Sequence, residues 1–344
     1  MITTKQRLWM MIFLPRAFFL GIGTSLVITI GTRDAWIGAI LGIIFGLILV
    51  LGIKHIQKYK NNATIYDILK EMKFVGIIVK LFMILFSIFL IIQSLVILQT
   101  YTSSFFLLRT PFCLIELVVL GTVIYIVSKG LSTAFKMFEL LIVISMLIFL
   151  FSFFNLVPYI EIDNFLPLFS SSSTSIFKTA LLFASLSATP TILMIQLNDN
   201  GKHLMWGYLI STITILLILV TCLGVFGYKL ANVFRYPEYL VLKKISLFNF
   251  IEKAENILSI NWVIDLFAVL ILATNFLKSS FANKHGKYVY GLILIMVFII
   301  SSSFLGTSYS FDTIIYYYSP YILLGFYFCI VIPLLIYFKT RKKH

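Results

Sequence analysis

Ten long apolar runs divide this chain, and their length restricts its possible folds more than any other feature. A helix that crosses the hydrocarbon core of a bilayer needs about 20 apolar residues. The runs cover residues 8–30, 34–53, 79–104, 111–128, 135–156, 176–197, 204–228, 257–277, 287–305 and 319–338. Because every backbone polar group must be satisfied inside lipid, such runs predict helices. We therefore expect an all-α polytopic membrane protein, with ten transmembrane helices in a single domain over residues 1–344.

Composition supports this class and excludes others. Of the 344 residues, 60% are hydrophobic and 12% are charged, whereas a soluble domain has about 25% charged residues. The net charge of +14 does not indicate nucleic-acid binding, because most basic residues lie between apolar runs, where topology explains them. Cys113, Cys222 and Cys329 are far apart inside apolar runs and indicate neither disulfides nor a metal site. The sequence contains no enzyme motif, so we expect neither catalysis nor a cofactor.

The distribution of basic residues predicts the orientation. Ten spans place both termini on the same side, and 17 Lys and Arg residues fall on that side. Seven fall on the opposite side, and five of these belong to the segment around residues 229–253. Because cytoplasmic loops carry the excess of Lys and Arg, both termini are expected in the cytoplasm. The first run is too long for the core of a signal peptide, so we expect it to remain as an uncleaved span.

The spans divide into two sets of five with a matching layout. In each set the loop between the second and third spans is charged and is expected to contain a helix. These loops are residues 54–74 and the lid segment, residues 234–256. An odd number of spans per set places the loops on opposite membrane faces, as in an inverted-topology repeat. We expect repeats over residues 8–156 and 176–338.

Two polar interruptions occupy equivalent places in the two sets. The first span contains GIGTS, residues 21–25, and the sixth contains SLSATPT, residues 185–191, where Pro190 removes a helix hydrogen bond. In inverted-repeat transporters the first helix of each set is often broken, and the freed backbone groups bind a ligand. The alternative is that these small residues only allow close helix packing.

Few ionisable residues fall inside the spans, and these are functional candidates because a buried charge in lipid is costly. Glu116, Glu139 and Lys80 lie near span ends, where a side chain is expected to reach the interface. Arg16 either reaches the interface or pairs with a buried carboxylate. Asp265 is a candidate for lining a cavity or an ion path.

Two motifs resemble a known family. RDAWIGAILG, residues 33–42, is similar to the signature that opens the second span of endospore germination permeases. These are the B subunits of nutrient germinant receptors, within the amino acid–polyamine–organocation superfamily. The lid segment and the start of the eighth span match a second family motif at Arg235, Tyr236, Pro237, Tyr239, Ile245, Phe250, Lys253, Glu255 and Trp262. The chain departs from the family pattern at both expected helix breaks. Ligand identity is therefore the family property that transfers least to this chain.

The resemblance implies a LeuT-like fold of five plus five helices, with helices 1 and 6 broken, in the spore inner membrane. It implies a nutrient receptor subunit, commonly for an amino acid, that acts with a membrane A subunit and a lipoprotein C subunit. The expected ligand-binding residues are Gly21, Gly23, Thr24, Ser25, Gln93, Ser185, Ser187, Thr189 and Asp265, and the expected lid and assembly residues are Arg235, Tyr236, Pro237 and Glu255. The alternatives are a proton- or sodium-coupled amino-acid permease, with Asp265 or Glu116 as ion site, and an assembly scaffold with a vestigial pocket.

Overall fold

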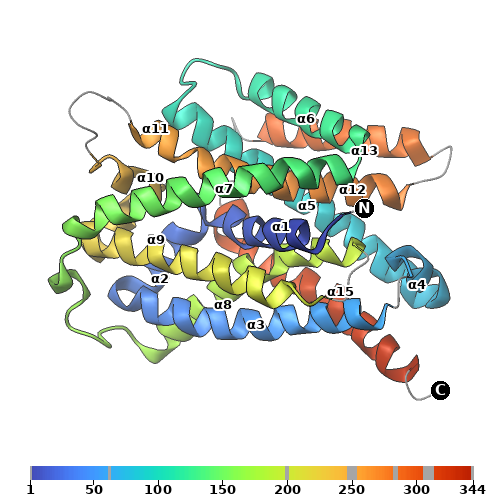
Figure 1. Ribbon diagram of the computed structural model, residues 1–344, viewed down its shortest axis with the longest axis horizontal. Coiled ribbons are helices and arrows are strands. Elements are labelled where there is room, and N and C mark those ends of the chain that lie inside the picture. The colour runs from blue at the N-terminus through green and yellow to red at the C-terminus, as the bar shows by residue number, and fades with distance from the viewer. Residues whose placement is uncertain are drawn as a thin grey trace.

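The computed structural model describes residues 2–60, 63–197, 201–245, 254–281, 286–304 and 314–341, and its regular elements are helices (Figure 1). The α-helices are α1 (Thr4–Arg16), α2 (Gly23–Gly31), α3 (Ala35–Tyr59), α4 (Ile65–Glu71), α5 (Lys73–Phe105), α6 (Phe112–Lys129), α7 (Leu131–Leu156), α8 (Ser173–Ala188), α9 (Leu204–Val233), α10 (Pro237–Leu242), α11 (Ala254–Leu258), α12 (Ile260–Ser280), α13 (Gly286–Phe304) and α15 (Ser319–Arg341). Short 3-10 helices include η1 (Ala17–Phe19) and η5 (Thr189–Gln196).

Eight helical segments within the described ranges are long and apolar enough to cross a membrane. They are Gly23–Tyr59, Lys73–Phe105, Phe112–Lys129, Leu131–Tyr159, Ser173–Gln196, Leu204–Val233, Glu255–Ser280 and Ile314–Arg341. The expected span 8–30 consists of the shorter helices α1 and α2, and the expected span 287–305 contains a shorter apolar stretch, Tyr288–Ser303. The chain is therefore an all-helical multi-pass membrane protein, and ten crossings remain a prediction.

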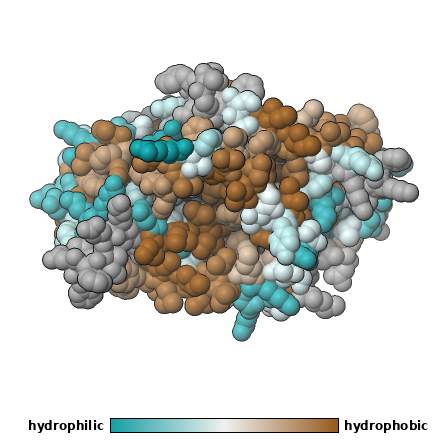
Figure 2. Space-filling model, turned by 90° about the horizontal axis from the view of Figure 1, so that it is seen from above, coloured by the Kyte–Doolittle hydropathy of each residue, from teal (hydrophilic) through white to brown (hydrophobic). Residues whose placement is uncertain are grey.

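The surface has the polarity that such a protein requires. Figure 2 shows apolar side chains across the middle of the molecule and hydrophilic side chains gathered toward both ends. Figure 1 places α4 and both termini toward one end and α10 toward the other. The charged loops that precede α5 and α12 therefore lie at opposite ends of the molecule, as the sequence layout predicts.

Helices α3 and α8 pack closely because α3 carries glycine every fourth residue. A Cβ atom added to Gly38 would lie 2.6 Å from Thr179, and one added to Gly42 would lie 2.7 Å from Phe183. Small residues at this spacing allow helix backbones to approach each other, which gives the packing that membrane helices need. The family-like motif at residues 33–42 is therefore a helix-packing surface against the sixth expected span.

We expect Gly42→Ala to destabilise the protein, because the new methyl group meets both Phe183 and the Ala180 carbonyl oxygen. Gly121→Ala is the matched control, since a Cβ atom there meets nothing within 4 Å. Both changes gain the same helix propensity, so their difference isolates the clash, about 1–3 kcal/mol. The midpoint of thermal unfolding in detergent measures it. Equal midpoints would show that α3 and α8 separate without cost.

Candidate functional site

The first expected span is interrupted at its centre. Helix α1 ends at Arg16, η1 follows, and α2 begins at Gly23 after a turn at residues 20–22. Gly21 has φ +65°, which a residue with a side chain rarely adopts. Its backbone N–H does not continue a helix and instead donates a hydrogen bond of 2.6 Å to Oε1 of Glu238. The break thus frees a backbone donor, and the lid segment supplies the acceptor.

The lid helix α10 is a short helix that begins at Pro237, where the missing N–H of proline costs nothing. Its residues Pro237, Glu238, Tyr239, Val241 and Leu242 are buried. An aromatic cluster holds it against α5 and α12. The ring centroids of Phe105 and Tyr239 are 4.0 Å apart, those of Tyr101 and Tyr236 are 5.5 Å apart, and those of Tyr101 and Trp262 are 6.5 Å apart.

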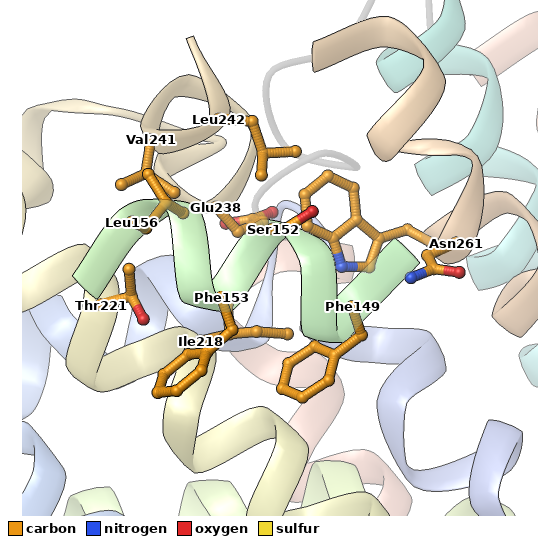
Figure 3. Close-up of a pocket in the computed structure, with 11 residues that line it drawn as sticks. Phe149, Ser152, Phe153, Leu156, Ile218, Thr221, Glu238, Val241, Leu242 and Asn261 are labelled. Carbon is orange, nitrogen blue, oxygen red and sulfur yellow. The ribbon is translucent and has the colours of Figure 1, made fainter. Parts of the chain in front are cut away.

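Beneath α10 lies a mostly apolar cavity of about 50 Å³ (Figure 3). Side chains from α7, α9, α10 and α12 converge on it, among them Phe149, Ile218, Glu238, Asn261 and Trp262. Among the described residues, Glu238 Oε2 and Asn261 Oδ1 are buried and have no hydrogen-bond partner. A space of this size holds a few water molecules. Two of the residues that line this cavity therefore carry a buried oxygen whose hydrogen-bonding capacity is unused among the described residues.

A second, smaller cavity of about 20 Å³ adjoins the first and shares Phe149, Ile218, Asn261 and Trp262 with it. Arg16, Thr24 and Asp265 add polar groups to its wall. The two cavities therefore share a wall, with the lid carboxyl group lining the first and a buried charged pair lining the second.

That pair is Arg16 and Asp265, whose side chains are 4% and 1% exposed. Arg16 Nη2 lies 2.5 Å from Asp265 Oδ1 and also donates to Ser145 Oγ at 2.9 Å. Asn261 Nδ2 donates to the Ser145 backbone oxygen at 2.9 Å. Of the two alternatives for Arg16, pairing with a buried carboxylate is the one observed. A buried pair of this kind survives only with such additional hydrogen bonds.

Glu238 lies outside the membrane-spanning helices, and its environment changes its acidity. Burial raises the pKa of the Glu238 carboxyl group from 4.5 to about 8, and the hydrogen bond from Gly21 opposes this in part. A buried carboxyl group without a cationic partner favours the neutral form because ionisation in an apolar environment is costly. Near neutral pH the Glu238 carboxyl group is therefore mostly neutral, and a cation placed beside it would favour the ionised form.

The expected ligand-binding residues fall into separate groups. Thr24 and Asp265 line the smaller cavity, whereas Gly21 contacts the lid. Ser25 Oγ contacts Tyr316 Oη at 2.5 Å, and a Cβ atom at Gly23 would meet the Phe19 ring. On the sixth span, Ser185 and Thr189 make hydrogen bonds within their own helix, and Ser187 also contacts Tyr208 Oη at 2.7 Å. Gln93 is buried on α5 without a hydrogen-bond partner among the described residues, and it lies outside the walls of both cavities.

Sequence reasoning did not single out Glu238 and Asn261 as site residues. In the sequence, Glu238 is one of several charged residues of the lid segment, and Asn261 lies near the start of an apolar run. The available signal was an acidic residue directly after Pro237, at the first turn of a helix expected to close over the break. The expectation that Glu116 reaches the interface is wrong, because its side chain is 1% exposed. It turns into the bundle, and neither carboxyl oxygen has a partner among the described residues.

The lid expected over residues 234–256 is observed as α10 and the start of α11, while residues 246–253 lie outside the described residues. Arg235 is exposed, with its guanidinium carbon 5.8 Å from the ring centroids of Tyr236 and Tyr316. Glu255 is half-buried at the start of α11. In the described part of the chain, no three His, Cys, Asp or Glu residues form a group that could hold a metal ion.

Replacing Gly21 with Ala is expected to disturb the lid, because the added Cβ atom would lie 2.1 Å from Tyr236. Gly130→Ala is the control: Gly130 has φ +95°, and a Cβ atom there meets nothing within 4 Å. Both changes strain the backbone, at about 1–2 kcal/mol, and only the first also displaces the lid. We expect faster protease cleavage in the lid segment of Gly21→Ala alone. If Gly21→Ala is cleaved at the same rate as Gly130→Ala, Tyr236 does not pack against Gly21.

Comparison with known proteins identifies the relatives of this chain. A family model described as "Spore germination protein" matches residues 2–310. In Bacillus subtilis (strain 168), spore germination protein A2 is 26% identical over 283 residues, 76% of each chain. The putative spore germination protein YfkT is 21% identical over 243 residues, 69% of this chain and 67% of the relative. Spore germination protein B2 is 22% identical over 251 residues, 70% of this chain and 68% of the relative. The match over most of the sequence confirms the resemblance of the two motifs, and the chain belongs to the spore germination protein family.

Proposed function

We propose that this chain is a receptor subunit for spore germination that binds a small nutrient, an amino acid, at the two adjoining cavities beneath α10. One observation carries the proposal. Glu238 Oε2 and Asn261 Oδ1 are buried without a hydrogen-bond partner among the described residues, and both residues line a cavity that shares a wall with the cavity at the Arg16–Asp265 pair. Buried polar groups are normally hydrogen-bonded, so unpartnered ones need an explanation. An ammonium group satisfies both acceptors.

The same arrangement suits the other end of an amino acid. Arg16 has five N–H donors, a larger number than its contacts with Asp265 and Ser145 use. A ligand carboxylate would accept from the remaining Arg16 donors, and a ligand ammonium beside Glu238 would favour the ionised form of that carboxyl group. Phe149, Ile218 and Trp262 surround the apolar part between them. The substrate class is therefore small and zwitterionic.

The cavity has room for a few water molecules, so an amino acid enters only when its walls move. We propose that the lid is the wall that moves, because α10 is a short helix and the Glu238 side chain holds it to Gly21 by a single hydrogen bond. A ligand that competes for Glu238 favours a displaced lid, and binding shifts the population toward that state. The larger membrane A subunit and the lipoprotein C subunit are the proposed recipients of this signal.

We propose for this family member a fold of ten spans in two inverted sets, with both termini in the cytoplasm and the protein in the spore inner membrane. The interrupted first span, the change from α8 to η5 at Thr189, and the opposite placement of α4 and α10 support the inverted layout. The excess of basic residues on the side of the termini supports the orientation. The relatives named as spore germination proteins support the cellular role.

Ligand-dependent thermal stabilisation of the full-length protein tests the proposal. Individual amino acids are screened on the wild type, then on Asn261→Ala and on Ser187→Ala. Loss of stabilisation in Asn261→Ala alone supports the cavity beneath α10. Loss in Ser187→Ala alone moves the site to the sixth span. If spores that lack this chain germinate normally with every nutrient tested, the receptor role is wrong.

A coupled amino-acid permease is the second candidate, and Glu116 favours it. This carboxyl group is buried on α6 without a hydrogen-bond partner among the described residues, and buried carboxyl groups in transporters often carry protons. Concentrative uptake of a labelled amino acid into proteoliposomes, abolished in Glu116→Gln, would establish transport. Thermal stabilisation by the amino acid without uptake would support the receptor role instead of transport.

A further inference from the structure

The groove between α4 and α5 lies at the end of the molecule opposite the lid, and it belongs to neither cavity. It encloses about 510 Å³, and its walls include Tyr66, Lys70, Lys73, Phe74, Ile77 and Lys80. Gly76 holds its corner closed, because a Cβ atom there would lie 1.8 Å from the Leu69 carbonyl oxygen. The corner turns at Lys73, whose φ is +50°. The groove is therefore a fixed feature of how the two helices meet.

Three lysines bring positive charge to this groove. None of Lys70, Lys73 and Lys80 forms a salt bridge with any described residue. Of the two acidic residues of α4, Asp67 interacts with Lys70 only at longer range, and Glu71 is paired elsewhere. Asp67 accepts from Thr64 at 2.6 Å, and Glu71 pairs with Arg341 at 2.9 Å and accepts from Tyr337 at 2.6 Å. The groove thus has room for an anion.

An apolar stripe leads away from the lysines along α5. Lys73, Ile77, Leu81 and Leu85 are spaced four residues apart, so they share one face of the helix. Ile77 is 68% exposed and Leu81 is 55% exposed. The 33 residues of α5 extend for about 50 Å, longer than the roughly 30 Å hydrocarbon core. Its first turns therefore reach the headgroup layer, and the stripe continues into the acyl region.

We propose that this groove binds an anionic glycerophospholipid, with its phosphate among Lys70, Lys73 and Lys80 and one acyl chain along Ile77, Leu81 and Leu85. The charge matches the headgroup, and the adjacent exposed stripe matches the tail. A free anion would need the lysines but not the stripe. The side of the membrane is the one on which the sequence places most of its Lys and Arg residues, where anionic lipids attract basic segments.

Native mass spectrometry of the detergent-solubilised full-length protein, titrated with phosphatidylglycerol or phosphatidylcholine, tests this site. We expect Lys70→Gln/Lys73→Gln/Lys80→Gln to lower phosphatidylglycerol binding at least about fivefold. The control Lys58→Gln/Lys129→Gln/Lys136→Gln removes the same charge from exposed positions on the same expected side, and we expect less than a twofold change. Arginine at the three groove positions retains binding. Equal losses in the groove and control variants would overturn the proposal.

The proposed contact between the acyl chain and α5 needs a separate test. Ile77→Ser/Leu81→Ser is expected to weaken phosphatidylglycerol binding at least threefold, whereas Leu140→Ser/Ile144→Ser, an exposed pair at the same spacing on α7, leaves it unchanged. Inorganic phosphate at 10 mM is expected to displace little of the bound lipid. Full displacement by phosphate, with no effect of the Ile77 and Leu81 changes, would reveal a site for a free anion and refute the lipid.

Discussion

Arg16→Met is expected to destabilise the protein by about 3–5 kcal/mol, because it leaves the Asp265 carboxylate buried without its cation. Asp265→Asn leaves Arg16 uncompensated and is expected to cost a similar amount. In contrast, Arg16→Met/Asp265→Leu replaces both charges with apolar side chains and is expected to recover most of the loss. The reason is that pairing repays desolvation only while both partners are present, and here both are at most 4% exposed.

Thermal unfolding of the four proteins in detergent gives the coupling free energy as a double-mutant cycle. Ser145→Ala is a graded control, since it removes only the 2.9 Å hydrogen bond to Arg16 and should cost about 1 kcal/mol. Single variants that each cost under about 1 kcal/mol would mean that water reaches the pair. A stable double variant that no longer responds to amino acids would show that the pair serves ligand binding more than folding.

The helices and the helix breaks were accessible from sequence because their causes are local. Apolar runs specify helices in lipid, and Gly21 together with Pro190 specifies where regular helix ends. The structure interrupts the first span at residues 17–22, which overlaps the expected interval only at residues 21–22, and changes α8 into η5 at Thr189, within the second expected interval. The α4 helix in the loop before α5 was predictable for the same reason.

The contacts that define the site were not accessible in this way, because they join distant residues. Gly21 and Glu238 are 217 positions apart, and Arg16 and Asp265 are 249 positions apart. From the sequence, Arg16 and Asp265 could be recognised as charges that are costly in lipid, but their pairing with each other could not be predicted. The sequence showed Glu238 only as a charged residue in a loop. Its burial depends on how α10 packs against the helix interruption at residues 17–22.

Glu238 gives the second large effect, and its sign follows from proton binding. Its pKa is raised in the folded protein from 4.5 to about 8, so the folded state binds more protons than the unfolded state between these values. Stability therefore falls as the pH rises from 4.5 to about 8, and this contribution is greatest at the acidic end. At 1.36 kcal/mol per unit of pKa, the effect has a ceiling of about 5 kcal/mol.

Glu238→Gln is expected to remove this pH dependence, because the amide stays neutral and still offers Gly21 an acceptor. The variant should match the wild type near pH 5 and exceed its thermal midpoint near pH 8.5. Glu161→Gln, a change at an exposed carboxylate, should leave the wild-type profile intact. Glu238→Ala should also lose the pH dependence and should lie below Glu238→Gln at every pH, since it leaves the Gly21 N–H without its acceptor.

The same series tests whether the lid carboxyl group belongs to the ligand site. If an ammonium group binds Glu238, an amino acid stabilises the ionised form, and the fall in stability with pH becomes shallower when ligand is present. Glu238→Gln would lose this ligand effect while keeping a folded lid. A ligand effect of wild-type size in Glu238→Gln would leave Glu238 as a latch between α10 and Gly21 and would move ammonium recognition to Asn261.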